Sequence, residues 1–482
     1  MLNFRPIALV SGTVICAVGF LLFIPMITEL IYQTESWQSY FVPILLYLIV
    51  GGSLLITNRN VELKISIKQA FLITVLSWIL FGILCAVPFI YTQINLSVID
   101  AFFESMSGIT TTGATIINNL DELPKGILLW RALLQWLGGI GIVVIALVIL
   151  PFLRVGGMQL FHLEGDDPYD KFLPKISSVV IKIIIVYSSL TAVLFILYYL
   201  NKMTLFDALA HSLTTISTGG FSTHNDSFGY FQNISILNIA IIFMILGSFP
   251  FLILAQMSIT NVSSLIRDHQ IRLFLAILVF AISLIYYFAR PYVNGNAFQQ
   301  LSTISFNTIS IISGTGFVSS NFEKWGNYAS VLFLLLMFIG GCAGSTTGGL
   351  KIFRFQILFK YIYLHLKRML QPHMVITAKF NGKIVTESTY ESVVIFFFVY
   401  ILTFAASALL LSFSGLNFLT CISAAASSIS NVGPGLGEII GPDGNYSSLT
   451  NYSKLVLILT MFLGRLEMLT IFVLLIPSFW KN

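Results

Sequence analysis

Long apolar runs recur along the whole chain, separated by short polar connections. Each run is long enough to cross the roughly 30 Å hydrocarbon layer of a bilayer as a helix, whereas a membrane β-barrel would show short segments of alternating polarity. The pattern therefore predicts an all-α integral membrane protein with ten transmembrane helices. The predicted spans cover residues 7–31, 41–57, 67–91, 127–152, 175–200, 234–258, 271–290, 327–372, 388–413 and 452–479.

The composition agrees with lipid as the solvent for most of the chain. Hydrophobic residues make up 57% and charged residues 9% of the sequence, whereas about a quarter of an ordinary soluble domain is charged. The run at 7–31 follows Arg5 as a signal peptide would, but its apolar core is too long, so we expect it to remain as the first helix. The cysteines lie in apolar or small-residue segments without metal-ligand spacing, which favours packing over disulfides. They are Cys16, Cys85, Cys342 and Cys421.

Lysine and arginine are distributed unevenly between the two sides of the predicted bundle. Eighteen of them fall on the side of both termini and six on the other, and Arg465 lies inside the last span, which accounts for all 25. Because cytoplasmic loops carry an excess of basic residues, the distribution predicts that both termini are cytoplasmic. The basic segments are therefore topology signals first, and nucleic-acid binding is a poor second interpretation.

Four connections on the predicted outer side contain a half-length apolar segment that ends in a cluster of Gly, Thr, Ser and Asn. These segments are too short to cross a bilayer, so they predict re-entrant half-helices. They cover residues 101–115, 208–222, 304–318 and 421–435.

One spacing is common to these segments, because an Asp or Thr precedes a glycine by thirteen residues in each. Asp and Thr are good N-caps, so we expect each half-helix to begin there. The pairs are Asp100 and Gly113, Asp207 and Gly220, Thr303 and Gly316, and Thr420 and Gly433. The glycines lie 107, 96 and 117 residues apart, which predicts four pseudo-repeats of helix, re-entrant pore helix, filter loop and helix around one pore, preceded by two extra helices. The units are 1–62 for the helix pair and 63–160, 161–262, 263–375 and 376–482 for the repeats.

Such a ring of glycine turns favours the passage of cations. Non-helical backbone at membrane depth is tolerated only where it is buried in protein or lines water. Loops around one axis would form rings of carbonyl oxygens that replace the hydration shell of a cation, and the half-helices would face the ion with the partial negative charge of their C-terminal ends. A seam of small residues that packs helices is the alternative. The candidate filter residues are Thr111, Thr112, Gly113, Thr218, Gly219, Gly220, Gly314, Thr315, Gly316, Asn431, Val432 and Gly433.

The loops resemble the pore loops of the Trk/Ktr/HKT superfamily, and within it those of the TrkH family. The similar segments are Thr111-Thr112-Gly113-Ala114-Thr115, Ser217-Thr218-Gly219-Gly220-Phe221, Gly314-Thr315-Gly316-Phe317 and Asn431-Val432-Gly433-Pro434-Gly435. The likeness covers essentially the whole chain, including the extra helix pair. It implies K⁺ uptake across the bacterial inner membrane, with K⁺ bound only at the filter and preferred over Na⁺ because every loop has a glycine. It also implies a homodimer in membrane lipid and a TrkA-like cytosolic nucleotide-binding subunit, with no cofactor in this chain.

The eighth span is interrupted by ten small residues at 340–349, within an apolar pattern far longer than one membrane helix. Such a stretch does not hold a helix well, and a broken helix at mid-depth needs protein or water around it. We expect it beneath the filter as an intramembrane gating loop, the role that the resemblance implies, with a packing seam as the alternative. A nucleotide-binding loop is disfavoured because Lys351 is followed by Ile352. The candidate gate residues here are Gly340, Gly341, Gly344, Ser345, Thr346, Thr347, Gly348 and Gly349.

Arg465 lies about thirteen residues into the last predicted span. An unpaired cation at that depth is costly and is functional by default. Glu467 is two positions further on and faces another side of the helix, so a local ion pair is not expected. We predict that Arg465 helps to close the ion path, either by repelling K⁺ or by bonding carbonyls of the gating loop, and a structural ion pair within the bundle is the alternative.

The residues leave the mode of transport open. Channel-like conduction, controlled by a cytosolic subunit that docks on the basic segments between 351 and 383, is the first hypothesis. A secondary transporter that couples K⁺ to H⁺ or Na⁺ is the main alternative, although the acids lie mostly at span ends and caps. An intramembrane enzyme would need a nucleophile or a His-Glu-x-x-His pair, which is missing, and an anion conductor conflicts with the polarity of the half-helices.

Three weaker features are interpreted as structural. The glycines of Gly138-Gly139-Ile140-Gly141 are expected to pack helices. The acidic segment 162–170 is expected to be a solvated face or a partner contact rather than a metal cluster. His211 is expected to make a packing or cap-side contact beside the filter.

Overall fold

The computed structural model describes residues 4–60, 66–149, 155–161, 169–256, 263–371, 379–381 and 383–481. Within these ranges the regular secondary structure is helical apart from one antiparallel hairpin, in which β1 (Lys379–Phe380) pairs with β2 (Lys383–Ile384), and an isolated parallel bridge between Ile339 and Leu350. Its register places Lys379 opposite Ile384 and Phe380 opposite Lys383. The predicted all-α class is confirmed.

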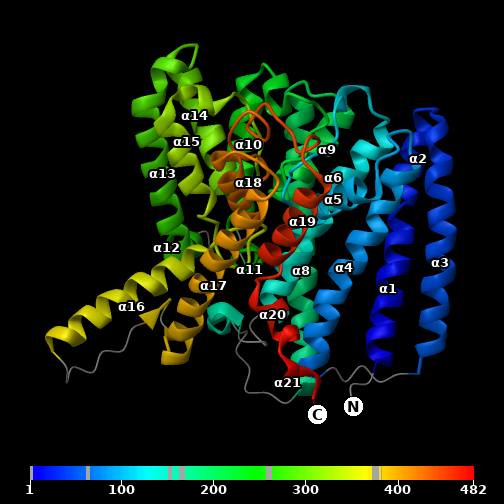
Figure 1. Cartoon of the computed structure of the whole chain (residues 1–482), viewed down its shortest axis with the longest axis horizontal. Coiled ribbons are helices and arrows are strands. Elements are labelled where there is room, and N and C mark those ends of the chain that lie inside the picture. Colours follow the sequence, from blue (N-terminus) through cyan, green and yellow to red (C-terminus); the bar gives the residue numbers. More distant parts are fainter. Residues whose placement is uncertain are drawn as a thin grey trace.

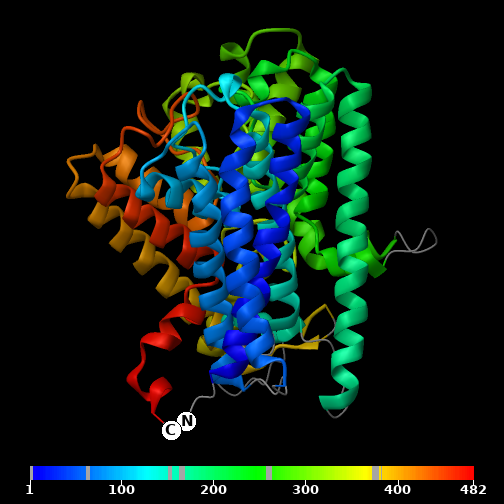
Figure 2. The same ribbon diagram turned by 90° about the vertical axis from the view of Figure 1, so that its right-hand side faces the viewer.

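Seven helical stretches of the described chain are long and apolar enough to cross a membrane, and two helices joined at a 109° bend make an eighth crossing if they count as one span. The seven coincide with predicted spans one to five, seven and nine. They contain α1 (Arg5–Leu21) with α2 (Phe23–Ile31), α3 (Gln38–Asn58), α4 (Ile67–Tyr91), α6 (Lys125–Val144), α8 (Tyr169–Leu200), α13 (His269–Ala289) and α17 (Glu387–Ser412). Figure 2 shows α8 running nearly the full height of the molecule.

The other three predicted spans are broken helices. They consist of α10 (Ile234–Gly247) with α11 (Phe251–Gln256), α15 (Asn327–Met337) with α16 (Ile352–Leu370), and α19 (Asn451–Arg465) with α20 (Leu469–Leu475). The first break precedes Pro250, which has no N–H to continue the ladder of α10. The second is the run of small residues 340–349. The third falls at Glu467, whose φ of +55° no helix accepts.

Half-length helices precede all four glycine clusters. They are α5 (Val98–Ile109), α9 (Leu205–Ile216), α14 (Ala297–Ile312) and α18 (Phe418–Ser430). Figure 1 shows them in the upper half of the molecule, whereas both termini lie at its lower end and α16 projects to one side. Two short helices, α12 (Ser263–Arg267) and α21 (Pro477–Trp480), complete the set.

The half-helices begin earlier than predicted. Their side-chain N-caps each accept a hydrogen bond from the backbone N–H three residues further on, and they are Ser97, Thr204, Asn296 and Asn417. The predicted caps Asp100, Asp207 and Thr420 occupy that third position, and Thr303 lies inside α14, so the cap predictions are wrong. The Asp100 carboxylate instead accepts from the Ser97 hydroxyl at 2.8 Å, a role that suits the first turn.

The extra N-terminal helices are tied closely to each other and to the bundle. A Cβ on Gly51 of α3 would lie 2.6 Å from the Cys16 sulfur of α1, so this crossing requires glycine. Cys16 therefore packs as predicted, and all four cysteines are free thiols. Buried Glu29 of α2 accepts from the Gly126 N–H at 2.6 Å, in the first turn of α6. Since Pro124 provides no side-chain cap for α6, this carboxylate takes that role.

Candidate ion pathway

The four half-helices end with the same backbone hydrogen bond. We number the filter loops one to four by their glycines, Gly113, Gly220, Gly316 and Gly433. In each loop the N–H of the residue before that glycine donates to a carbonyl five residues back, at 2.8 to 2.9 Å. The donor and acceptor residues are Thr112 and Ser107, Gly219 and Thr214, Thr315 and Ser310, and Val432 and Ser427. This is the closing bond of a Schellman motif, so the same helix-ending turn occurs in the same register four times.

Each loop contains two left-handed residues separated by one other residue. The pairs and their φ values are Thr111 (+53°) and Gly113 (+81°), Thr218 (+49°) and Gly220 (+84°), Gly314 (+66°) and Gly316 (+80°), and Asn431 (+54°) and Gly433 (+105°). A β-branched threonine at positive φ is strained and persists only where the surrounding structure imposes it. The loops are therefore held in shape by their surroundings.

The filter glycine of each loop lies against the backbone of the next loop. A Cβ on Gly113 would lie 2.3 Å from the Gly219 carbonyl oxygen, and one on Gly220 would lie 1.9 Å from that of Thr315. The corresponding distances are 1.9 Å from Gly316 to Val432 and 2.7 Å from Gly433 to Thr112. The contacts run from loop one to two, three and four and back to one. The structure thus brings the candidate filter residues of all four loops together in one closed ring.

A cavity lies at each end of this ring. The outer cavity, of about 80 Å³, is lined by all four filter glycines together with Arg131 and His224. The inner cavity, of about 30 Å³, is lined by Asn431, Arg465 and four residues of the loop 340–349. The two cavities share no lining residue, and residues of the ring line both of them.

Two buried amides support the ring from the side. Gln135 of α6 donates to the Gly219 carbonyl at 2.6 Å and accepts from the Phe221 N–H at 2.9 Å. Asn431 of loop four donates to the Thr112 hydroxyl of loop one at 2.9 Å. We did not predict Gln135, because nothing in its spacing connects it with the loops. A lone amide within the apolar run 127–152 was the available signal.

The loop 340–349 packs directly against the ends of α18 and α9. A Cβ on Gly348 would lie 2.1 Å from the Ser430 carbonyl oxygen. The Thr346 hydroxyl lies 3.0 Å from that of Thr218 in loop two and donates to the Gly247 carbonyl at 3.0 Å. The candidate gate loop is therefore in direct contact with the ring, at its inner side.

Arg465 is buried and bonds carbonyl oxygens rather than a carboxylate. Its guanidinium donates to the Thr346 carbonyl at 3.0 Å and to the Gly138 carbonyl at 3.4 Å. Among the described residues no carboxylate lies within ion-pair distance of it. Glu467, which we did not expect to pair with Arg465, pairs with Arg354 at 2.7 Å.

Lys351 and Arg354 are not surface residues, which corrects their assignment to a cytoplasmic docking segment. Their side chains are 9% and 1% exposed, because they lie at the start of α16 beside the inner cavity. The Lys351 ammonium donates to the Thr347 carbonyl and hydroxyl, the latter at 3.0 Å. Arg354 also lies 3.8 Å above the Phe396 ring. The basic surface available to a partner therefore begins further along α16.

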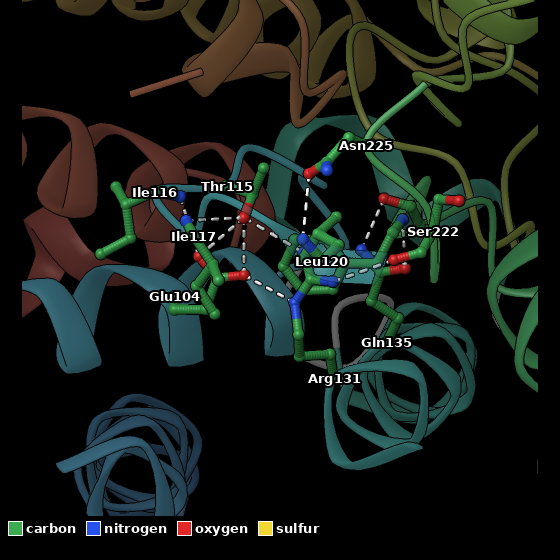
Figure 3. A network of polar contacts seen from close by, with 11 residues as sticks. Glu104, Thr115, Ile116, Ile117, Leu120, Arg131, Gln135, Ser222 and Asn225 are labelled. Carbon is green, nitrogen blue, oxygen red and sulfur yellow. Dashed lines mark hydrogen bonds and ion pairs between the residues drawn. The ribbon is translucent and has the colours of Figure 1, made fainter. Parts of the chain in front are cut away.

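A second buried ion pair lies behind filter loops one and two, where no acid was predicted. Glu104 in the middle of α5 and Arg131 of α6 pair at 2.8 Å and are 0% and 1% exposed (Figure 3). Glu104 is thus an exception to the expectation that the acids lie mostly at span ends and caps. The available signal was one acid and one arginine in two consecutive apolar segments.

The weaker features have structural surroundings. A Cβ on Gly138 would lie 1.9 Å from the Ile109 carbonyl oxygen, so this glycine packs α6 against α5. The His211 ring bonds the Asp207 carbonyl at 2.9 Å and the Ser222 hydroxyl at 3.0 Å, so it makes the expected cap-side contact. The acidic segment lies outside the described residues from 162 to 168.

A closed ring of glycine loops on half-helices, inside a bundle of membrane-length helices, defines a multi-pass membrane protein of the pore-loop class. The family model for TrkH, described as cation transport protein, matches residues 37–482. The chain belongs to the TrkH family, which confirms the resemblance seen in its loops.

Relatives and a solved structure match over the full length. The chain is 36% identical over 481 residues to the Trk system potassium uptake protein TrkI of Halomonas elongata, covering 100% of this chain and 98% of the relative. It is 36% identical to TrkH of Escherichia coli K12 over 488 residues, with both chains fully covered. The crystal structure of the potassium transporter TrkH from Vibrio parahaemolyticus superposes with a TM-score of 0.92 at 34% identity and covers both chains completely.

Proposed function

We propose that this protein takes up K⁺ across the bacterial inner membrane by channel-like conduction through its four filter loops. The closed ring of backbone contacts among the filter glycines is the observation that carries the proposal, because it surrounds one axis with carbonyl oxygens. Relatives named as Trk system potassium uptake proteins support K⁺ as the ion. An enzymatic role has no support in a cation transport family.

The half-helices supply the charge and the loops supply the ligands. The C-terminal ends of α5, α9, α14 and α18 meet at the ring, and their partial negative charge stabilises a dehydrated cation. The ligands are carbonyl and hydroxyl oxygens of the candidate filter residues. The Gly219 carbonyl can also act as a K⁺ ligand, because it has two lone pairs and accepts only one hydrogen bond from Gln135. A glycine in every loop favours K⁺ over Na⁺.

The chain forms ten crossings in four repeats after an N-terminal helix pair. Three crossings are the broken helices α10 with α11, α15 with α16, and α19 with α20. The identical turn at the end of every half-helix supports the division into repeats. Irregular backbone at membrane depth is tolerated here because it lies against protein and cavities. The excess of Lys and Arg on one side supports a cytoplasmic location for both termini.

The gate is formed by the loop 340–349 and Arg465. The loop lies between the ring and the inner cavity, and Arg465 ties its Thr346 carbonyl to the Gly138 carbonyl of α6. A guanidinium held there blocks the path by volume and repels K⁺ by charge. Opening therefore requires Arg465 and the loop to move together.

Control comes from a cytosolic, TrkA-like nucleotide-binding subunit, and the membrane protein acts as a homodimer. The relatives are named as proteins of a Trk system, which supports a transport system that contains more than one component. Helix α16 projects from the body of the molecule (Figure 1) and exposes a row of apolar side chains. An exposed apolar surface of this kind is typical of a protein–protein interface, which supports a partner or a second copy bound there. The apolar side chains are Phe359, Ile362, Tyr363, Leu366, Met369 and Leu370.

A K⁺ transporter coupled to H⁺ or Na⁺ is the second candidate. Its support is the presence of buried acids, Glu104 and Glu467, within the bundle. Each of them is already engaged in an ion pair with a buried arginine, at 2.8 Å for Glu104 and 2.7 Å for Glu467, which gives it a structural partner within the bundle. Conduction without coupling therefore agrees better with the geometry.

Reconstitution into liposomes tests the proposal. With opposed K⁺ and Na⁺ gradients, we expect the reversal potential of the purified protein to follow K⁺. A potential that followed Na⁺ or Cl⁻ would exclude a K⁺ filter. A fixed ratio of H⁺ or Na⁺ to K⁺ moved would establish the coupled transporter instead.

A further inference from the structure

One position of each half-helix faces the back of its own filter loop. It lies nine residues before the filter glycine and is occupied by Glu104, His211, Asn307 and Ala424 in repeats one to four. In repeat one, Glu104 accepts hydrogen bonds from the Thr115 hydroxyl and the Ile116 N–H, both at 3.0 Å. It therefore holds the backbone two and three residues beyond the filter glycine.

Repeats two and three use neutral side chains at this position. His211 bonds the Ser222 hydroxyl, two residues beyond the glycine of loop two, at 3.0 Å. Asn307 bonds the hydroxyl and the N–H of Ser319, three residues beyond the glycine of loop three, at 2.8 and 3.1 Å.

In repeat four the neighbouring residue takes over. Ala424 has no polar atom, and Ser423 instead accepts from the Leu436 N–H at 2.9 Å. A side chain thus anchors the same stretch of backbone behind all four loops, and only repeat one uses a charge.

The charge of Glu104 recruits an arginine that reaches a second loop. Arg131 donates through Nη2 to the Thr115 hydroxyl of loop one at 3.1 Å and through Nη1 to the Ser222 carbonyl of loop two at 3.0 Å (Figure 3). Its guanidinium also lies 4.1 Å above the Phe221 ring. Arg131 therefore links loop one to loop two. Among the filter loops, Glu104, His211 and Asn307, by contrast, each bond only the loop of their own repeat.

Stability alone is a weak reason for this pair. Replacing a buried ion pair by apolar residues of similar volume is often neutral or stabilising, so such pairs are not explained by their contribution to folding. The position of Arg131 gives a second reason for its partner. Arg131 lines the outer cavity, where an uncompensated positive charge would repel an entering cation. Glu104 neutralises that charge.

We propose that Glu104 and Arg131 form a selectivity-determining pair that fixes the spacing of filter loops one and two and keeps the mouth of the filter neutral. This inference rests on the proposed K⁺ filter. The link lies directly beyond the close approach of Gly113 to Gly219, so losing it changes the distance between two of the four loops. The pair acts through the loops and does not itself bind the ion.

Two single variants break the link in different ways. Glu104→Gln keeps the shape but leaves Arg131 uncompensated, and Arg131→Lys keeps the charge but cannot donate to both loops in the same geometry. We expect the K⁺/Na⁺ permeability ratio from reversal potentials to fall by about tenfold in each, which corresponds to 1.4 kcal/mol. Unitary K⁺ conductance should fall further in Glu104→Gln, because the positive charge remains at the mouth.

A matched control is the pair of Asp100 and Lys454, 2.7 Å apart at the start of the same half-helix. Asp100→Asn removes an ion pair from α5 without touching loops one or two, so it should lower thermal stability but keep the wild-type ratio. Wild-type ratios in Glu104→Gln and Arg131→Lys, or an equal loss in Asp100→Asn, would overturn the inference.

Two further measurements distinguish a failure to fold from a failure of the proposal. If the single variants do not fold, the double variant Glu104→Gln/Arg131→Met removes both buried charges and should fold. It also lacks the link, so a wild-type permeability ratio in the double variant contradicts the proposal. If the wild-type protein itself does not prefer K⁺, the proposed function fails, and that result is distinct from a selective wild type with unaffected variants.

Discussion

At the scale of single residues, space at the filter glycines is as restrictive as their backbone conformation. Each has a positive φ, and a Cβ on each would meet a carbonyl oxygen of the neighbouring loop at 2.7 Å or less. Any side chain must therefore push two loops apart. A ring built from such backbone contacts is sensitive to the smallest substitution.

Gly113→Ser should relax selectivity for K⁺. The new Cβ would lie 2.3 Å from the Gly219 carbonyl oxygen, so loops one and two must separate, and we expect the K⁺/Na⁺ permeability ratio to fall by about 10- to 100-fold. Reversal potentials in liposomes measure this ratio. Gly52→Ser is the control, because a Cβ on Gly52 has no heavy atom within 4 Å. An unchanged ratio in Gly113→Ser would count against the filter assignment.

Arg465→Gln should raise K⁺ flux at rest. The variant keeps a hydrogen-bond donor but removes the charge and shortens the reach to the Thr346 and Gly138 carbonyls. Uptake of ⁸⁶Rb⁺ into liposomes without a regulatory subunit measures the resting flux. A lowered or unaltered flux would assign Arg465 a structural role instead.

At the scale of elements, breaks in helices rather than whole helices distinguish this fold. The half-helices and the break at 340–349 could be predicted, because their lengths and small-residue clusters are local features. The bend after α19 could not, since Leu466-Glu467-Met468 contains neither Gly nor Pro. The caps were misplaced because Asp and Thr suit the first turn almost as well as the cap.

The residues that contact the loops from other parts of the chain could not be predicted from local sequence. Which residue lies behind a loop is decided by tertiary packing, so Gln135, Glu104 and Lys351 stand out in the sequence only as polar residues near apolar segments, without showing which loop each contacts. The loop residues themselves could be identified, because positive φ restricts the choice of residue type at the position itself. Sequence therefore predicts the ring members better than it predicts what holds them.

Lys351→Met should destabilise the closed conformation of the loop 340–349. Methionine keeps the length of the side chain but loses the ammonium that bonds the Thr347 carbonyl and hydroxyl, so resting K⁺ flux should rise. The same ⁸⁶Rb⁺ assay applies. Lys360→Met is the matched control, because Lys360 lies on α16 with an exposed side chain. Equal fluxes in the two variants would show that Lys351 does not hold the loop.

At the scale of the whole molecule, a histidine beside the outer cavity connects loops of two repeats. His224 lies 2.5 Å from the Asp121 carboxylate and 3.4 Å from that of Asp207, and its ring stacks on Tyr230 at 3.5 Å. Burial lowers the pKa of His224, but the neighbouring carboxylates of Asp207 and Asp121 outweigh this and raise the pKa above its ordinary value of 6.5. The protonated form therefore ties the connection after α5 to the connection after α9.

The contribution of His224 to stability should depend on pH. Because its folded pKa is raised, the stabilisation is complete below about pH 6.5 and is lost as the pH rises through the folded value. The melting temperature of His224→Gln should thus fall below that of the wild type at about pH 6, with a smaller difference at about pH 9. His365→Gln, which changes an exposed histidine on α16, controls for general effects. A difference that does not change with pH would contradict the assignment.

The ring of filter contacts also sets an order of events during synthesis. Its last contacts join Asn431 and Gly433 of loop four to Thr112 of loop one, and Asn431 and Thr112 are 319 residues apart. Contacts between such distant parts of a chain form late, because a long loop must close first. While the fourth repeat is still being synthesised, loops one to three lack the contacts that loop four makes with loops three and one. On the proposed function, the ring through which K⁺ would pass closes only when the last helices of the chain are in place.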